Sequence, residues 1–203
     1  MKDEPLLFIV SAPSGAGKST LICKAIENLP KLRLSVSYTT RSTRDYEKDG
    51  VDYHFIDNRT FDRMIAEGRF LEWTSIHGNR YGTAIDEIQQ AKTDEVDLIF
   101  EIEGKGAYQV MDAYPDAISI FVIPPSMENL RAQLIGRKTE DSDQIHKRLA
   151  NAKKELEYLP RYQYVIVNDV LNQAVQNLEA IIRCHRLKSY KQQDAINKLL
   201  SDR

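Results

Sequence analysis

The chain has 203 residues, of which 42% are hydrophobic and 29% are charged. This length suits one domain with inserted lobes, or one domain plus a small second one, and the composition can fill a hydrophobic core. A formal net charge of −2 argues against general nucleic-acid binding, so any anion must be bound by focused arginines and helix termini.

The first predicted element is a buried strand over residues 6–10, which leads into a glycine-rich turn. Residues 12–20 read A-P-S-G-A-G-K-S-T, and apolar residues then recur at helical spacing from Leu21 to Leu29. Strand, glycine-rich turn and helix are the context of a P-loop, in which backbone N–H groups and the positive end of the helix dipole bind a phosphate chain. The pattern G-x-x-x-x-G-K-[ST] is met except at its first position, where Ala12 replaces glycine.

This turn predicts the binding of a nucleoside triphosphate together with Mg²⁺. Gly15 and Gly17 let the backbone approach the phosphates closely. Lys18 can reach the β- and γ-phosphates, and the Ser19 hydroxyl is placed to bind Mg²⁺. The turn residues predicted to bind the nucleotide are Ser14, Gly15, Ala16, Gly17, Lys18, Ser19 and Thr20. A glycine-rich connection that merely caps a helix is the alternative, and the Gly-Lys-Ser-Thr core directly after a strand disfavours it.

Residues 35–91 are predicted to form a small inserted lobe. We expect short mixed strands at 34–38, 53–56 and 70–76 and a short helix near 61–67. Arg41 and Arg44 lie three residues apart near several tyrosines, and guanidinium groups bind phosphate through paired hydrogen bonds. This array predicts a phosphate clamp, although a solvated, charge-rich turn would explain either arginine alone.

Further apolar strands are predicted at 96–102, 117–123 and 164–167, with helical patterns between them. This alternation predicts an α/β fold with a parallel sheet covered by helices on both faces. A helical insertion follows the third strand: Ser126 caps a helix that runs to Arg137, residues 138–141 form a polar break, and a second helix carries Leu149 and Leu156. We therefore assign residues 1–34, 92–125 and 160–203 to the core, 35–91 to the first insertion and 126–159 to the second.

A long amphipathic helical pattern begins at residue 172, and its apolar stripe fits packing on the core or on a second subunit, which leaves a homo-oligomer open.

Cys23 and Cys184 form no C-x-x-C pair, so we expect buried free thiols and a cytoplasmic protein. No apolar run is long enough to cross a bilayer and no signal segment is evident, so no membrane partner is expected. The histidines show no metal-ligand spacing and are expected at the surface or its boundary; they are His54, His77, His146 and His185.

The combination of polar motifs resembles the guanylate kinases. The motifs are S-x-T-T-R-x-x-R-x-x-E-x-x-G-x-x-Y-x-F from residue 37, F-L-E-W, N-x-Y-G-T, E-I-E-G-K-G after a strand, I-G-R and K-R-L in the helical insertion, and V-N-D near the C-terminus. The resemblance runs from the P-loop to about residue 170. It implies a P-loop core, a GMP-binding lobe and a helical lid, and transfer of the ATP γ-phosphoryl group to GMP, giving ADP and GDP.

The resemblance also implies roles for residues at matching positions. The GMP phosphate would be held by Arg41, Arg44, Tyr53 and Tyr81, and the guanine would face Ser37, Glu72, Thr83 and Glu103. The residues implied in catalysis are Lys18, Arg41 and the lid arginines Arg137 and Arg148, and Asn168 would lie near the adenine end of ATP.

The chemistry of the substrates agrees with these roles. Guanine presents donors at N1 and N2, which the Glu72 carboxylate can accept together, whereas adenine presents an acceptor at N1. The second pKa of a nucleoside monophosphate is near about 6, so the attacking oxygen is mostly ionised and no general base is required. The barrier is then one of positioning and charge neutralisation by Mg²⁺, Lys18 and the arginines.

Glu101 and Glu103 lie two residues apart at a strand end, so both side chains point to the face of the ligand crevice. The family usually has Asp-x-Asp followed by a bulky residue, whereas this chain has Glu-x-Glu followed by Gly104. We expect Glu101 to act near the metal through water. We also expect Gly104 to relax the backbone into a conformation closed to other residues, which shifts the strand end so that the longer Glu103 still accepts from guanine.

Two other functions fit parts of the sequence. A non-catalytic, guanylate-kinase-like protein-binding module would have no use for Lys18, Ser19, Arg137 and Arg148 together. A P-loop kinase that acts on a sugar phosphate would have no need for Glu72 and Thr83. The sequence therefore favours the guanylate kinase reaction over both alternatives.

Overall fold

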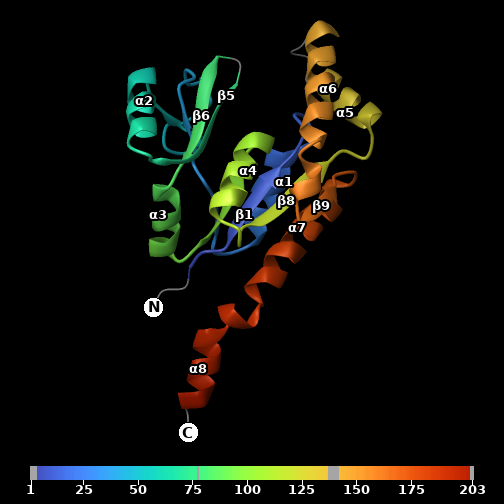
Figure 1. Cartoon of the computed structure of the whole chain (residues 1–203). Helices are drawn as coiled ribbons and strands as arrows, with labels where there is room; N and C mark the ends of the chain where they lie inside the picture. Colours follow the sequence, from blue (N-terminus) through green and yellow to red (C-terminus); the bar gives the residue numbers. More distant parts are fainter. Residues whose placement is uncertain (1–3, 77, 137–141, 202–203) are drawn as a thin grey trace.

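The computed structural model describes residues 4–76, 78–136 and 142–201. Its core is a five-stranded parallel sheet with the strand order β2-β7-β1-β8-β9, of which Figure 1 labels β1, β8 and β9. These strands are β1 (Leu7–Ser11), β2 (Leu32–Leu34), β7 (Asp97–Glu101), β8 (Ile118–Ile123) and β9 (Tyr164–Val167). The predicted α/β class is confirmed, and the strands predicted at 6–10, 96–102, 117–123 and 164–167 agree with β1, β7, β8 and β9 to within one residue at each end.

Helices cover both faces of this sheet because its strands are apolar on both sides. On one face, α1 (Lys18–Asn28) and α7 (Leu171–Arg186) pack against Phe8 and Val10 of β1. On the other face, α3 (Asp86–Asp94) and α4 (Gly104–Ala113) pack against Leu7 and Ile9. Successive side chains of β1 thus enter opposite layers of the core. The loop that follows β1 thus starts from a strand whose five residues are all buried.

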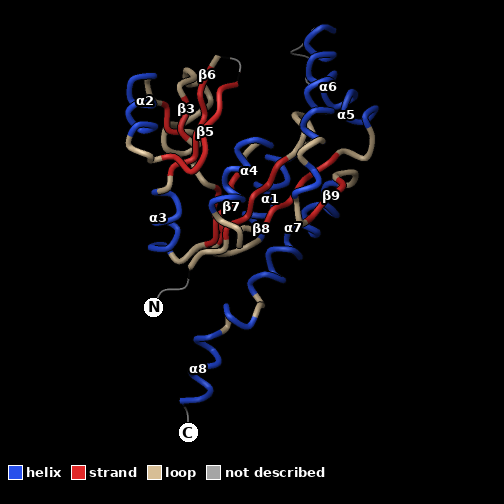
Figure 2. The backbone as a smooth tube through the Cα atoms, viewed as in Figure 1, coloured by secondary structure: helices blue, strands red, loops and turns tan. Residues whose placement is uncertain are grey.

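A second sheet forms the inserted lobe and has the strand order β4-β3-β6-β5. Its strands are β3 (Tyr38–Thr39), β4 (His54–Phe55), β5 (Phe70–Ile76) and β6 (Asn79–Ala84), and Figure 2 shows them as a group separate from the core sheet. The helix α2 (Asn58–Ala66) covers this sheet by stacking Phe61 on Phe70. It begins three residues before the predicted helix because the Asp57 carboxylate caps it by accepting from the Thr60 N–H at 2.7 Å.

The single strand predicted at 34–38 is wrong. Leu34 ends β2 in the core sheet, and Tyr38 begins β3 in the second sheet. The residues between them bond in both directions: the Ser35 N–H donates to the Ile99 carbonyl of the core, and the Ser37 carbonyl accepts from the His54 N–H of the lobe. An apolar run can therefore be shared between two sheets, which local periodicity does not reveal.

The second insertion contains α5 (Met127–Gly136) and α6 (Ser142–Leu156). The Ser126 hydroxyl caps α5 by accepting from the Asn129 N–H at 3.1 Å, as the sequence predicted. Leu130 and Leu134 of α5 and Ala152 of α6 are fully buried in a small core of their own. The predicted polar break at 138–141 lies outside the described residues.

The amphipathic pattern at the C-terminus is not one helix. α7 ends at Arg186, a 3-10 turn spans Ser189–Lys191, and α8 (Gln193–Ser201) follows. α8 has no buried residue and projects beyond the core sheet toward the C-terminus (Figure 1). None of the helices in the described ranges is both long and apolar enough to cross a membrane.

Two expectations about single side chains are wrong. Cys23 and Cys184 are exposed free thiols rather than buried ones, because the neighbouring helical positions Ile22 and Ile182 are the ones that face the core. His185 is buried with 6% exposure, since it continues the buried stripe of α7. The Tyr164 hydroxyl lies 3.0 Å from its Nε2 atom, and burial lowers the pKa of this histidine.

Candidate active site

The loop between β1 and α1 has the backbone of a phosphate-binding turn. Gly15 and Gly17 have φ angles of +97° and +82°, which other residues rarely adopt. Space also requires them: a Cβ at Gly15 would lie 2.8 Å from Leu134 Cδ2, and one at Gly17 would lie 2.6 Å from Asn168 Nδ2. Ala12, which replaces the first glycine of the motif, has no positive φ and is buried in the core. A cavity of about 200 Å³ is lined by the turn and two acidic residues, namely Ala12, Pro13, Ser14, Gly15, Ala16, Gly17, Lys18, Ser19, Thr20, Glu101 and Glu103.

Asn168 supports this loop from the end of β9. Its side-chain amide donates to the Ala16 carbonyl at 2.8 Å, and its backbone N–H donates to the Ile123 carbonyl at 2.8 Å. The side chain is buried, so these bonds hold the loop in a fixed position relative to the sheet. The contact of Asn168 with adenine stays a prediction.

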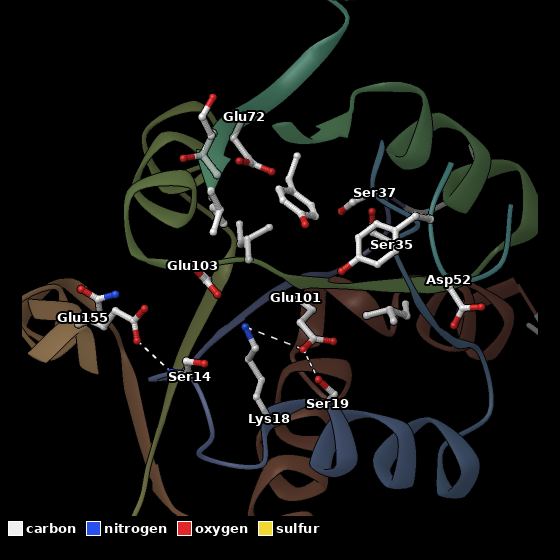
Figure 3. A pocket seen from close by; sticks show the side chains of 18 of the residues that line it. Ser14, Lys18, Ser19, Ser35, Ser37, Asp52, Glu72, Glu101, Glu103 and Glu155 are labelled. Atoms are coloured by element: carbon white, nitrogen blue, oxygen red, sulfur yellow. Dashed lines mark hydrogen bonds and ion pairs between the residues drawn. The ribbon is translucent and has the colours of Figure 1, made fainter. Parts of the chain in front are cut away.

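Lys18, Ser19 and Glu101 meet at the first turn of α1 (Figure 3). The Ser19 hydroxyl donates to Glu101 Oε1 at 2.5 Å, and Lys18 Nζ lies 3.9 Å from the same oxygen. A hydroxyl and a carboxylate beside a phosphate loop are hard oxygen ligands of the kind that Mg²⁺ takes, usually one or two per site with water and phosphate completing the shell. Among the described residues, no group of three or more His, Cys, Asp or Glu forms a candidate metal site.

A buried carboxylate lies in the inserted lobe. Glu72 of β5 is 5% exposed and pairs across the sheet with Thr83 of β6, whose hydroxyl donates to Glu72 Oε1 at 2.8 Å. Burial raises the pKa of Glu72 to about 7. Ser37 extends the cluster, since its hydroxyl lies 3.4 Å from that of Thr83. The three predicted guanine-facing residues of the lobe are thus brought together.

Gly106 of α4 makes room for this carboxylate, and sequence reasoning missed it. A Cβ at Gly106 would lie 2.4 Å from Glu72 Oε2, so no other residue fits without moving Glu72. The only signal in the sequence was the second glycine of E-I-E-G-K-G, which carries no information about a residue 34 positions away.

Arg41 and Arg44 have different environments. Arg41 makes a two-point ion pair with Glu47, with nitrogen–oxygen distances of 2.9 and 2.7 Å, and the hydrogen bond to Glu47 raises the pKa of the arginine. The guanidinium also lies 5.6 Å from the centre of the Tyr53 ring. Arg44 is more exposed and donates to the Tyr46 hydroxyl at 2.9 Å. In the sequence Glu47 is only one position of the motif that begins at Ser37, and the structure shows its contact with Arg41.

One cavity of about 680 Å³ joins the P-loop to the buried carboxylate. It is lined from the P-loop side by Ser14, Lys18, Ser19, Glu101 and Glu103, from the lobe by Ser37, Arg44, Tyr53, Glu72 and Tyr81, and from α6 by Arg148, Asn151 and Glu155. Figure 3 shows Lys18 and Glu72 entering this space from opposite sides. Residues from three separate parts of the chain therefore share one site. Arg137, the other predicted lid arginine, lies outside the described residues.

The expectation for Gly104 is wrong. Gly104 is the first residue of α4 and has no positive φ, so its backbone is not in a conformation closed to other residues. Its missing side chain instead admits Tyr158, whose Cδ2 atom would lie 2.2 Å from a Cβ at this position. Glu103 precedes the helix and lines the cavity, and its contact with guanine stays a prediction.

The structure therefore defines an α/β protein in which the glycine-rich loop after β1 and a buried carboxylate share one polar cavity. The chain belongs to the guanylate kinase family, because the model of the family described as "Guanylate kinase" matches residues 4–185. The family resemblance read from the motifs is thereby confirmed.

Individual relatives agree with this family. A guanylate kinase of Alcanivorax borkumensis is 43% identical over 192 residues, which cover 95% of this chain and 93% of the relative. A guanylate kinase of Syntrophotalea carbinolica is 44% identical over 194 residues, covering 93% and 92%. The crystal structure of guanylate kinase from Anaplasma phagocytophilum is 31% identical, matches with a TM-score of 0.75, and covers 93% of this chain and 89% of that chain.

Proposed function

We propose that this chain transfers the γ-phosphoryl group of ATP to GMP, giving ADP and GDP. The observation that carries the proposal is the single cavity between the P-loop and the Glu72–Thr83 pair, since phosphoryl transfer needs both nucleotides in one space. The family and the relatives named guanylate kinase support the same reaction.

GMP occupies the side of the cavity formed by the lobe. The ionised Glu72 accepts from guanine N1 and N2, and the Ser37 and Thr83 hydroxyls complete the polar edge. Glu103 accepts from the same donors across the cavity. The GMP phosphate is held by the guanidinium and phenol groups of Arg41, Arg44, Tyr53 and Tyr81. Arg44, Tyr53 and Tyr81 support this role because they line the cavity, and Arg41 lies beside them, 5.6 Å from the centre of the Tyr53 ring.

ATP occupies the side formed by the P-loop. Its phosphates accept hydrogen bonds from the N–H groups of the turn from Gly15 to Thr20 and lie near the charge of Lys18, and its adenine end extends toward Asn168. Ser19 would hold Mg²⁺ directly and Glu101 through water, and their hydroxyl–carboxylate contact supports the fit. When bound, the metal supplies positive charge and orientation to the phosphate oxygens.

In the reaction, an oxygen of the GMP phosphate forms a bond to the γ-phosphorus while the bond to the β–γ bridging oxygen breaks and ADP leaves. The attacking oxygen is already ionised, so the side chains neutralise charge rather than take a proton. Lys18 and Arg41 act from the core and the lobe, and the lid arginines Arg148 and Arg137 close over the transferring group.

This function assigns roles to the parts of the chain. Residues 35–91 act as the GMP-binding lobe, with the start of α3 at their end packed on the core sheet, residues 126–159 as the lid, and residues 1–34, 92–125 and 160–203 as the P-loop core. The exposed free thiols fit a reducing compartment, so we place the reaction in the cytoplasm. The uncovered α8 leaves a homo-oligomer as a proposal that sedimentation can test.

A substrate panel tests the proposed function. With ATP and Mg²⁺ as donor, turnover is expected with GMP and dGMP, with AMP and UMP slower by orders of magnitude. A ribose phosphate used in preference to GMP would overturn the assignment in favour of a sugar kinase. ATP binding without turnover of any acceptor would favour a protein-binding module.

Arg148→Ala should lower kcat about ten-fold to a hundred-fold with a smaller change in the KM for GMP, because the arginine meets charge that develops in the transition state. Steady-state rates with both nucleotides varied provide the measurement. A loss confined to the KM for GMP would place Arg148 in substrate binding instead. The matched control is Lys147→Ala, which changes the exposed residue of α6 directly before Arg148.

Glu47→Ala should raise the KM for GMP about ten-fold while the KM for ATP changes little, since Arg41 loses the two-point ion pair that orients it. Asp45→Ala, an exposed acidic residue of the same turn, removes the same charge and serves as the control. Equal effects of the two variants would mean that net charge, rather than the orientation of Arg41, governs GMP binding.

A further inference from the structure

The two lid helices rest on two consecutive residues of the P-loop. Glu155 of α6 accepts from the Ser14 N–H, with 3.0 Å between Oε2 and nitrogen (Figure 3). Leu130 and Leu134 of α5 pack against the adjacent Gly15, where a Cβ would lie 3.3 and 2.8 Å from their methyl groups. The same leucines form the buried core of the lid with Ala152. Both helices of the lid therefore contact the phosphate loop.

The helical spacing of α6 connects this contact to Arg148. Arg148 and Glu155 are seven residues apart, which places them two turns apart on one face of the helix, about 10 Å along its axis. Both line the large cavity, as does Asn151 between them. Any rotation of α6 that displaces Glu155 also displaces Arg148.

A second anchor holds the end of the same helix. Tyr158 packs over Gly104, and its backbone carbonyl accepts from the Tyr108 hydroxyl at 2.6 Å. One anchor lets a helix swing about that point. The bond from Glu155 to Ser14, three residues earlier, restricts the swing and sets the direction in which Arg148 faces.

The carboxylate does not fill the phosphate site. The cavity of about 200 Å³ inside the loop is lined by residues 12–20 with Glu101 and Glu103, and Glu155 is not among its lining residues. Glu155 thus bonds the turn from outside this small cavity, which leaves the cavity open to a phosphate chain. Burial and the nearby Glu103 raise the pKa of Glu155, while the Ser14 N–H and Lys18 lower it.

We propose that Glu155 is a positioning residue: by bonding the Ser14 N–H of the P-loop, it orients α6 so that Arg148 points at the phosphates of ATP. This inference rests on the proposed function in one respect, the role of Arg148 in phosphoryl transfer. The loop that binds ATP therefore also orients α6 and, through it, Arg148.

Three variants in α6 and just after it test the hydrogen bond. Glu155→Ala should lower kcat roughly ten-fold and leave the KM for GMP within about two-fold, because orientation is lost while the GMP pocket is intact. Glu155→Gln should retain most of the activity, since the amide oxygen still accepts from the Ser14 N–H. Glu157→Ala, an exposed acidic residue one position past the end of α6, is the control for charge and for folding. Should Glu155→Ala fail to fold, a Glu155→Gln variant as slow as Arg148→Ala would still overturn the proposal.

A double-mutant cycle tests whether Glu155 acts through Arg148. The variant that carries both Arg148→Ala and Glu155→Ala should be no slower than Arg148→Ala alone. Multiplied losses would overturn the positioning role, as would unchanged kcat in Glu155→Ala. Tighter ATP binding in both Glu155 variants would also overturn it, since the carboxylate would then compete with phosphate. Full activity of Arg148→Ala would refute the proposed role of that arginine in phosphoryl transfer. If Arg148→Ala is slow but Glu155→Ala keeps the normal kcat, only the positioning role of Glu155 is refuted.

Discussion

Lys18→Ala should lower the rate of phosphoryl transfer by roughly 10²- to 10³-fold and leave the fold intact. The lysine follows Gly17 at the start of α1 and faces the cavity that joins both proposed nucleotide sites. Positive charge placed beforehand where the phosphates gain negative charge stabilises the transition state, and removing one such group typically costs this much. Folding should be unaffected, because Lys18 Nζ lies 3.9 Å from its partner Glu101, beyond hydrogen-bond distance.

Initial rates with saturating ATP, Mg²⁺ and GMP measure this effect, and the thermal unfolding midpoint checks the fold. Lys24→Ala, further along α1, removes the same charge outside the cavity and should keep the normal rate. Turnover of Lys18→Ala close to that of the unchanged chain would refute the P-loop assignment.

Glu72→Gln should weaken GMP binding about a hundred-fold or more while ATP binding stays nearly unchanged. The glutamine amide presents a donor where guanine N1 and N2 require acceptors, and a buried donor left unpaired is costly. Calorimetric titration of each nucleotide separately measures the two affinities. Equal losses for GMP and ATP would mean that Glu72 supports the structure rather than reads the base.

The same variant should be more stable than the unchanged chain at neutral pH without nucleotide. Burial raises the pKa of Glu72 from an ordinary 4.5 to about 7, so between these values the folded chain binds more protons than the unfolded chain. The free energy of unfolding therefore falls by roughly 3 kcal/mol in total as pH rises from 4.5 to 7, and the contribution of Glu72 is constant above pH 7. Glu72→Gln removes this loss, so its unfolding midpoint should exceed that of the unchanged chain by several degrees at pH 8 and match it near pH 4.

Denaturant titrations from pH 4 to pH 8 measure the free energy of unfolding apart from GMP binding, and the exposed Glu67→Gln is the control. A variant that loses both GMP affinity and stability at pH 8 would contradict this account. If Glu72→Gln loses GMP affinity and gains stability, the Glu72 carboxylate destabilises the fold but is needed to bind GMP.

Much of the fold follows from local features of the sequence. Strands β1, β7, β8 and β9 were predicted from continuous apolar runs, which are typical of parallel strands with helices on both faces. The cap at Ser126 was predicted for the same local reason, since its hydroxyl bonds an N–H three residues away. The strand predicted at 34–38 was wrong because the two ends of that run pair with different sheets.

The P-loop motif, the helix that follows it and the family could be predicted because each depends on residue types at fixed short spacings. Which glycines leave room for other side chains, and which acids bond distant groups, depends on tertiary packing. Gly104 and Gly106 are glycines because Tyr158 and Glu72 occupy the space of their side chains. Glu155 reaches Ser14 across 141 residues of chain. Contacts of this kind arise from the packing of distant segments, so no local period or spacing encodes them.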